Sequence, residues 1–419
     1  MNEESNINHC AYYITRKKRY CRMRPVLSRK FCPEHSLFDE VLQNNESTAR
    51  MPCPLDRKHT CFVKGLEEHL KKCNSREKEK PIYYQKSING RILGKNEEKV
   101  TISEISDEEL TNLITKIKKT YNEFLMPLEI EEISHPVLNS ALKDSKNGQL
   151  AIKHLRQQAS LLGHMKNMKL LSNETCFVEF GAGRGQLTSW IIQAVNNKNS
   201  CKFILIDRAS QRHKFDTKLK YDKELHVERI RVDIEHLYLG RIPSISSHNG
   251  NIVGVTKHLC GAATDLALKC LMETLSDQEN HLNNYLLQGI IMALCCHHQC
   301  TWQTYVGRTF LEEQKYNQRE FQLLCGIASW ATCGRMPTHF DSNDDACNME
   351  NNNTDKNRYR RMNLGADCRE EIGRQCKRLL DYGRMRYLID HNYDAKLICY
   401  VEPAVSLENI ALVAINKNL

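Results

Sequence analysis

The sequence predicts an α/β protein in which a seven-stranded, mostly parallel sheet follows two small modules and a helical segment. Cysteine and histidine are concentrated in the first 80 residues, where few aliphatic runs occur. Helical apolar patterns lie within residues 101–170, and from Thr175 onward short apolar strands alternate with helical stretches. This alternation is typical of a parallel sheet with helices on both faces.

Length and composition set the broad class. A chain of 419 residues suggests two or three domains, and its 41% of hydrophobic residues can fill a sizeable core. No apolar run approaches the roughly eighteen residues of a membrane span, and the first residues lack a secretory pattern. We therefore expect an intracellular protein, nuclear or cytoplasmic, without a membrane partner. In a reducing compartment its 19 cysteines indicate metal binding, catalysis or burial rather than disulfides.

The first 45 residues contain one possible zinc ligand set with the spacing C-x10-C-x10-C-x2-H, made of Cys10, Cys21, Cys32 and His35. Three thiolates and one imidazole satisfy tetrahedral zinc. Within the same segment, six of the nine residues 16–24 are Arg or Lys. This basic run is interpreted as a solvated loop, a nuclear import signal or a contact to an anionic partner.

Residues 46–80 contain a second set with the spacing C-x5-H-x9-H-x3-C, made of Cys53, His59, His69 and Cys73. On a helix, His69 and Cys73 would share one face because they are four residues apart. Each set is complete with four ligands, so we expect two structural zinc ions. Cys61 is not expected to be a ligand. Residues 81–100 are predicted to form a polar linker.

Two helices are expected before the sheet. Ser106 and Glu109 have the spacing of a capping box ahead of an apolar helical face, and a second helical pattern covers residues 149–162. The expected strands are 176–180, 202–207, 229–233, 252–256, 289–294, 396–401 and 410–415. An acidic, Asn-rich run at 341–357 is predicted to be a disordered surface insertion.

The first strand of the expected sheet leads into a glycine-rich turn and a helix. Glycines allow close approach of a ligand, and the helix start offers free N–H groups. Acidic residues at the ends of the next two strands can accept ribose hydroxyls and an adenine amine. The candidate cofactor-binding residues are Glu179, Gly181, Gly183, Gly185, Asp207 and Asp233. This ordered set resembles the Rossmann-like, seven-strand S-adenosylmethionine-dependent methyltransferases.

Three later motifs extend the resemblance: VTKHLCGAATDL at 255–266, ALCCHHQC at 293–300 and GRQCKRLLD at 373–381. Together with the paired Cys/His patterns they resemble the eukaryotic tRNA ribose 2′-O-methyltransferases that modify the fourth nucleotide of the acceptor stem. The resemblance implies a CCCH module at 1–45, a CHHC finger at 46–80, a helical segment at 101–170 and a methyltransferase domain at 171–419. It also implies tRNA as the substrate.

Ribose methylation requires removal of a proton from a weakly acidic hydroxyl. Lys257 is the first candidate for a base or for stabilising the alkoxide, although a phosphate contact is as good an explanation. His258 is the second candidate, and His297 or His298 are further ones. Basic residues of a late helix are expected to contact tRNA phosphates; they are Arg369, Arg374, Lys377, Arg378, Arg384 and Arg386.

Several alternatives stay open. The motif of Cys295, Cys296, His297 and His298 could be a buried strand end, an active-site wall or a third zinc site, and strand alternation disfavours the last of these. The whole chain could instead be an RNA-binding adaptor with an inactive sheet domain, or a methyltransferase acting on a protein or small molecule. Two basic zinc modules would be surplus for the latter.

Overall fold

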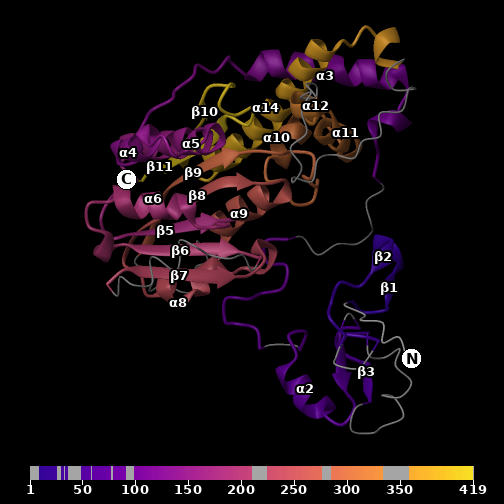
Figure 1. Cartoon of the computed structure of the whole chain (residues 1–419). Coiled ribbons are helices and arrows are strands. Elements are labelled where there is room, and N and C mark those ends of the chain that lie inside the picture. Colours follow the sequence, from indigo (N-terminus) through magenta and orange to yellow (C-terminus); the bar gives the residue numbers. More distant parts are fainter. Residues whose placement is uncertain are drawn as a thin grey trace. The chain divides into compact units, whose positions relative to one another are not determined.

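A computed structural model describes residues 9–25, 30–32, 34–35, 49–57, 59–76, 79–90, 99–209, 224–275, 285–333 and 358–418. The chain divides into two compact units, Met1–Pro81 and Ile82–Leu419. Each unit is described by itself (Figure 1). The Asn-rich run at 341–357 lies outside the described residues.

The first unit consists of short elements. A hairpin pairs β1 (Tyr13–Ile14) with β2 (Arg19–Tyr20) around the 3-10 turn η1 (Thr15–Lys17). A second hairpin pairs β3 (Arg50–Pro52) with β4 (Thr60–Phe62) and is followed by α2 (Leu66–Lys72). Among the described residues of this unit, every buried residue is a cysteine. The unit therefore lacks the aliphatic core that would hold these elements together without further bonds.

The second unit contains one seven-stranded sheet with the order β10-β11-β9-β8-β5-β6-β7. Only β11 runs antiparallel to its neighbours. The strands are β5 (Thr175–Phe180), β6 (Lys202–Asp207), β7 (His226–Arg231), β8 (Gly250–Leu259), β9 (Tyr285–Leu294), β10 (Tyr393–Cys399) and β11 (Ile410–Asn416). All seven predicted strands are confirmed. The third ends two residues earlier than expected, so Asp233 follows the strand rather than closing it.

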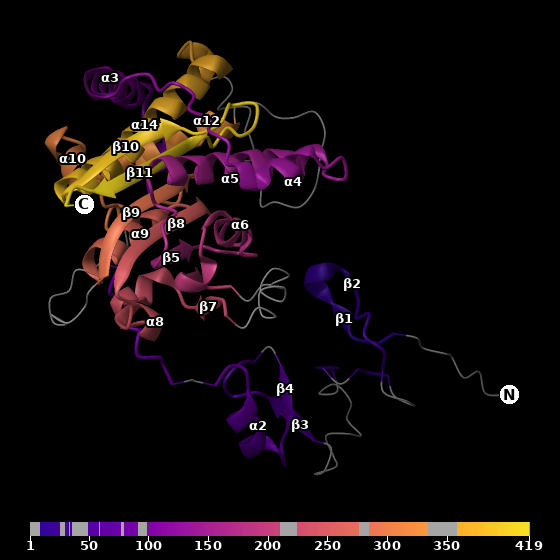
Figure 2. The same cartoon turned by 90° about the vertical axis from the view of Figure 1, so that its left-hand side faces the viewer.

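Helices cover both faces of the sheet (Figure 2). On one face α5 (Gln149–Asn167) and α6 (Gln186–Ala194) pack against side chains such as Phe177 and Phe203. On the other, α9 (Ala262–Glu273) and the carboxyl end of α14 (Ala366–Asp390) pack against Val178 and Ile204. Successive residues of a strand point to opposite faces, so Phe177 and Val178 belong to different cores. Among the described residues, no helix combines the length and apolarity needed to span a bilayer.

A third core lies beside the sheet, where α3 (Asp107–Phe124) and α11 (Gln318–Ala328) pack on α14. Ser106 caps α3 by accepting a hydrogen bond from Glu109 N at 3.1 Å. The Glu109 carboxylate pairs with Arg319 at 3.0 Å. The remaining elements are η3 (Ile102–Glu104), η4 (Pro136–Leu138), α4 (Asn139–Lys143), η5 (Lys198–Ser200), η6 (Ile234–His236), η7 (Leu239–Arg241), α8 (Pro243–Ser246), α10 (Arg308–Glu313) and α12 (Trp330–Cys333).

The predicted linker at 81–100 is wrong for residues 82–90, which pack against the segment that follows β7. Asn89 is fully buried, and its Nδ2 donates to the carbonyls of Ile234 at 2.6 Å and Leu237 at 2.7 Å. Ser87 donates to Glu235 at 2.8 Å. These contacts tie the start of the second unit to the loop that begins at Asp233.

Candidate functional site

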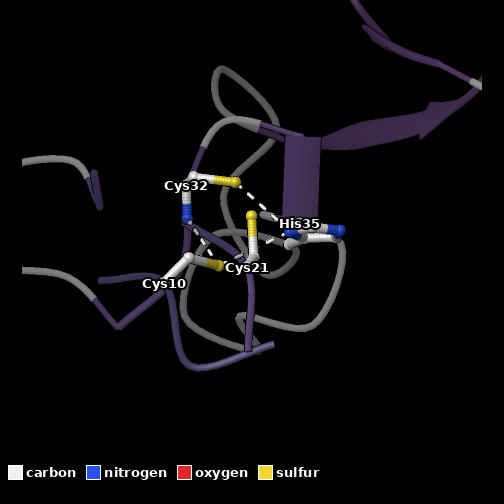
Figure 3. A group of neighbouring side chains, drawn as sticks. All are labelled: Cys10, Cys21, Cys32 and His35. Atoms are coloured by element: carbon white, nitrogen blue, oxygen red, sulfur yellow. Dashed lines mark hydrogen bonds between the residues drawn. The ribbon is translucent and has the colours of Figure 1, made fainter. Parts of the chain in front are cut away.

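The first ligand set comes together as predicted. Cys10, Cys21, Cys32 and His35 point toward a common centre (Figure 3). His35 Nδ1 lies 3.5 Å from Cys10 Sγ and 3.3 Å from Cys32 Sγ. The Tyr12 ring stacks on His35 with centroids 3.9 Å apart and orients the imidazole. The three sulfur atoms and one nitrogen fit a tetrahedral zinc ion.

The second set also converges. Cys53 and Cys73 have their sulfur atoms 3.7 Å apart, and the Nε2 atoms of His59 and His69 lie 3.2 Å apart. His69 lies on α2, and Cys73 is the residue that ends this helix. Cys61 is outside the set, since its sulfur points to the carbonyl of Met51 at 3.8 Å. Bonds from a metal to these four residues would supply the cohesion that an aliphatic core supplies elsewhere.

The β1–β2 hairpin with its continuation, residues 13–24, presents cations and rings to solvent; we call it the basic hairpin. Lys17 and Lys18 are exposed, and Lys18 adopts a left-handed conformation with φ of 48°. Tyr13 and Tyr20 are 46% and 61% exposed, and their rings meet edge to face at 5.2 Å. Exposed rings beside cations are the groups that bind single-stranded nucleic acids, by stacking and phosphate contacts.

In the second unit, the glycine turn joins β5 to α6. Gly181, Gly183 and Gly185 all have positive φ, at 63°, 50° and 74°. A Cβ on Gly181 would lie 2.8 Å from the Leu259 side chain. Because side chains are strained in this conformation, the turn requires glycine, and no side chain at these three positions would hinder a ligand. The first N–H groups of α6 face the same turn.

Glu179 supports this turn from within. Its Oε2 accepts hydrogen bonds from the Thr188 hydroxyl and from Thr188 N, the latter at 3.1 Å. Burial raises the pKa of Glu179 to about 7, while hydrogen bonds from Thr188 and the charge of Arg229 oppose that rise. Glu179 as a whole is only 4% exposed. We infer that Glu179 holds the start of α6 against β5.

Asp207 ends β6 next to the glycine turn. Its Oδ2 accepts from Gly183 N at 2.8 Å, and its Oδ1 accepts from Ala209 N at 2.8 Å. Each carboxylate oxygen keeps a further lone pair for a ligand hydroxyl. Asp233 caps the 3-10 turn η6 by accepting from Glu235 N at 3.1 Å. Asp207, the last residue of β6, and Asp233, two residues after β7, therefore both lie at the carboxyl edge of the sheet.

Lys257 lies near the end of β8, which pairs with β5. Its Nζ is 3.4 Å from His154 Nδ1 on α5. Desolvation lowers the pKa of Lys257 to about 8, and the negative charge of Glu179 opposes this. His258 is exposed and has a positive φ of 66°, at an irregularity of β8. Both residues are at the sheet edge that carries the glycine turn.

His297 is placed differently from these two candidates. His297 is 2% exposed, and its Nε2 lies 2.5 Å from Asp381 Oδ1. Arg384 donates to Asp381 at 3.0 Å and to both oxygens of Asp265, at 3.0 and 2.8 Å. This buried network joins the segment after β9 to α9 and α14. The burial of His297 disfavours the catalytic role that the sequence suggested, because a buried imidazole cannot contact a macromolecular substrate. His298 is exposed.

The late basic helix, α14, is mainly an internal element, so its prediction as an RNA surface is wrong for Arg384 and Lys377. Arg384 is 2% exposed, and Lys377 is 9% exposed and pairs with Glu408. Arg374 pairs with Glu370, and Arg378 donates to the carbonyl of Met126 at 3.1 Å. The sequence missed the network because buried charges are rare and their partners are remote in the chain.

The family model described as "Methyltransferase TRM13" matches residues 156–415. The chain belongs to the TRM13 methyltransferase family. Two further models match its first unit: "CCCH zinc finger in TRM13 protein" at residues 8–36 and "U11-48K-like CHHC zinc finger" at residues 50–74. These ranges contain the two convergent ligand sets. The chain is thus a TRM13 methyltransferase with two zinc-finger modules.

Relatives of the TRM13 family share almost the full length of the chain. A mouse protein named "tRNA:m(4)X modification enzyme TRM13 homolog" is 37% identical, over 97% of this chain and 94% of its own. The human protein of the same name is 38% identical with the same coverage. "tRNA:m(4)X modification enzyme TRM13" of Saccharomyces cerevisiae is 31% identical, over 97% of this chain and 96% of its own.

Solved structures include the SAH-bound methyltransferase PaMTH1 of Podospora anserina. It is 10% identical, with a TM-score of 0.32, and the match covers 78% of this chain and 100% of that one. The fold assignment itself depends on the strand order and on the single antiparallel strand, β11.

Proposed function

We propose that this TRM13 protein transfers a methyl group from S-adenosylmethionine to the ribose 2′-hydroxyl of the fourth nucleotide in a tRNA acceptor stem. One observation carries the proposal: a glycine turn with Asp207 and a partly buried lysine, Lys257, lie at one edge of the sheet. The names of the relatives, which describe tRNA:m(4)X modification enzymes, support a tRNA substrate.

The residues of the glycine turn fit the methyl donor. Gly181–Gly185 would lie against it, with the backbone N–H groups at the start of α6. Asp207 would accept the ribose hydroxyls, and its bond to Gly183 N orients the carboxylate for this role. Asp233 would accept the adenine amine. S-adenosylmethionine supplies an electrophilic methyl group on a sulfonium centre.

The acceptor is proposed to be a ribose because no base needs to leave the helix. Acceptor stems are A-form, and A-form RNA displays its 2′-hydroxyls in a wide, shallow minor groove. Methylation of a base within the duplex would instead require flipping. The basic hairpin offers cations for the phosphates of the stem, and the exposed rings of Tyr13 and Tyr20 offer stacking surfaces for unpaired bases outside the duplex.

Lys257 is proposed to accept the proton that leaves the 2′-hydroxyl as its oxygen bonds to the methyl carbon. Because its pKa is lowered, a fraction of the Lys257 side chains is uncharged near neutral pH. A general base must be uncharged to accept a proton. His154, at 3.4 Å from Nζ, orients the amine. His258 is the alternative base. The network of His297, Asp381 and Arg384 would hold the adjacent segment after β9 in place.

The two ligand sets of the first unit are each proposed to bind one structural zinc ion. Both are four-coordinate and closed, which is the pattern of structural rather than catalytic zinc. In this arrangement the ions would hold the basic hairpin and the β3–β4–α2 finger in shape. The first unit would then bind RNA while the second carries out the transfer.

The proposal is tested with purified full-length protein, S-adenosylmethionine labelled on its methyl group, and total tRNA, with and without ribonuclease. We expect the label to be incorporated into RNA, so that ribonuclease treatment releases it. Alkali should fail to cleave the bond after the methylated nucleotide, because cleavage needs a free 2′-hydroxyl. Label in protein, or in RNA that alkali cleaves at every position, would contradict ribose methylation. An inactive adaptor would transfer no label at all.

A further inference from the structure

A third group of cysteines lies at the carboxyl edge of the sheet, apart from both zinc-finger modules. The sulfur atoms of Cys260, Cys295 and Cys296 all lie within 4.8 Å of one another. The sulfur atoms of Cys260 and Cys295 are 3.1 Å apart. All three are free cysteines, so no disulfide explains their proximity.

The fold brings these residues together through strand register. Leu259 of β8 pairs with Leu294 of the parallel strand β9, so Cys260 and Cys295 leave the sheet side by side. Because β9 ends at Leu294, strand alternation does not apply to Cys295 and Cys296. Alternation was the sequence-based objection to a third zinc site, and the structure removes it.

The turn around the three cysteines is tightly built. Gly261 N donates to the carbonyl of Cys296 at 3.0 Å and ties the two strand ends together. Gly261 has a φ of 59°, and a Cβ there would lie 2.6 Å from Gln299 Cβ. This closure holds the segment that carries Cys295 and Cys296 against Cys260.

The sulfur geometry suits a zinc ion. A Zn–S bond of about 2.3 Å implies sulfur atoms roughly 3.8 Å apart in a tetrahedral site. In the group of three cysteines, one pair of sulfur atoms is 3.1 Å apart and all pairs lie within 4.8 Å. These limits include the separation expected around zinc. A disulfide would need about 2.05 Å. In the CHHC finger of the same chain the two sulfur atoms are 3.7 Å apart.

Only three ligands are present, and one side of the group is open. Cys295 is 6% exposed, whereas Cys260 is exposed to solvent. Among the described residues, no fourth His, Cys, Asp or Glu side chain belongs to the group. Three protein ligands with one free position are the pattern of catalytic rather than structural zinc.

We propose that Cys260, Cys295 and Cys296 bind a third zinc ion whose open position takes an oxygen ligand. The site is three residues from Lys257 and lies at the same edge of the sheet. The oxygen would be water in the free protein. During turnover it would be the acceptor hydroxyl, whose pKa a bound zinc lowers. This last role rests on the proposed function, whereas metal binding does not.

Zinc content of the full-length protein tests the site. Native mass spectrometry should find three zinc ions in the wild type and two in Cys260→Ala and Cys295→Ala. Cys368→Ala, at a partly exposed cysteine on α14, is the matched control and should keep three. Two ions in the wild type, or three in the Cys260 and Cys295 variants, would overturn the proposal.

Alkylation of the wild-type chain tests the site without any variant. We expect Cys260 and Cys296, which are not buried, to resist iodoacetamide until a chelator is added, while Cys368 reacts in both conditions. Equal reactivity before and after chelation, or a Cys260–Cys295 disulfide in non-reducing peptide maps, would overturn the metal site. Full methyl transfer by a variant that lacks the third ion would overturn the acceptor role. A wild type with three zinc ions and no transfer activity would refute the proposed function instead.

Discussion

Replacing Lys257 tests the proposed proton transfer because two substitutions separate a base from a fixed cation. Lys257→Met removes the amine, and Lys257→Arg keeps a positive charge that cannot be lost. If the neutral amine accepts the proton, both variants should lose about 10²- to 10⁴-fold in kcat. If a cation stabilises the alkoxide, the arginine variant should keep much of the wild-type rate.

The lowered pKa sets the expected pH dependence. With a pKa of about 8, about a quarter of the Lys257 side chains are neutral at pH 7.5, against about one in a thousand at the ordinary value of 10.5. Desolvation lowers this pKa, and the charge of Glu179 opposes the change. His154 and His258 are the other titratable groups nearby. For a base, kcat should rise about tenfold per pH unit below 8 and level off above it.

The assay measures initial rates at saturating tRNA and S-adenosylmethionine between pH 6 and pH 10. Lys202→Met is the matched control, because Lys202 begins β6 at the opposite edge of the sheet, where its Nζ donates to Ser244 at 2.8 Å. The control should keep the wild-type profile. A rate that falls above pH 8, together with an active Lys257→Arg variant, would refute the role of Lys257 as the general base. Full turnover by Lys257→Met would move the role to His258.

Four further changes test the rest of the account. Asp207→Ala should weaken S-adenosylmethionine binding by at least about tenfold, since each hydrogen bond to a charged group contributes about 1.5–3 kcal/mol; unchanged affinity in calorimetry would remove Asp207 from the site. Cys53→Ser should release about one zinc equivalent and unfold its finger while cofactor binding survives; a wild type without zinc would contradict both zinc-finger sites. Replacing the three basic residues 17–19 with serine should reduce the slope of log tRNA affinity against log salt by about 0.7–0.9 per lost phosphate contact. An unaltered slope would mean that these residues form a solvated loop without RNA contacts. Arg384→Met should lower the free energy of unfolding by about 3–5 kcal/mol, because two buried carboxylates lose their partner; Arg386→Met is the control, and equal losses would contradict the network.

The sequence was sufficient for features that depend on local pattern. Short apolar runs that alternate with helical stretches identified all seven strands, and ligand spacing identified both convergent Cys/His sets. The glycine turn could be placed because three closely spaced glycines stand between an apolar run and a helical pattern, and all three adopt positive φ in the structure. Ser106 was identified as a cap for the same reason, since its bond to Glu109 N spans only three residues.

Features that depend on distant partners could not be predicted. Polar residues 82–90 were interpreted as a linker, because nothing local shows that Asn89 bonds to carbonyls about 145 residues away. Arg384 was assigned to an RNA surface for a similar reason: its two carboxylate partners are visible only in the fold. The proximity of Cys295 and Cys296 to Cys260 likewise appears only in the fold, because it depends on the pairing of β8 with β9.

Removing a single oxygen atom from the substrate tests whether the methyl group is transferred to the ribose of nucleotide 4. Synthetic tRNA can carry a 2′-deoxynucleotide at position 4, and a control tRNA can carry it at position 5. We expect the position-4 substitution to abolish methyl transfer, because the accepting atom is gone, while the control is methylated at close to the wild-type rate. Binding of both RNAs should be equal. Continued methylation of the position-4 deoxy tRNA would contradict transfer to that ribose.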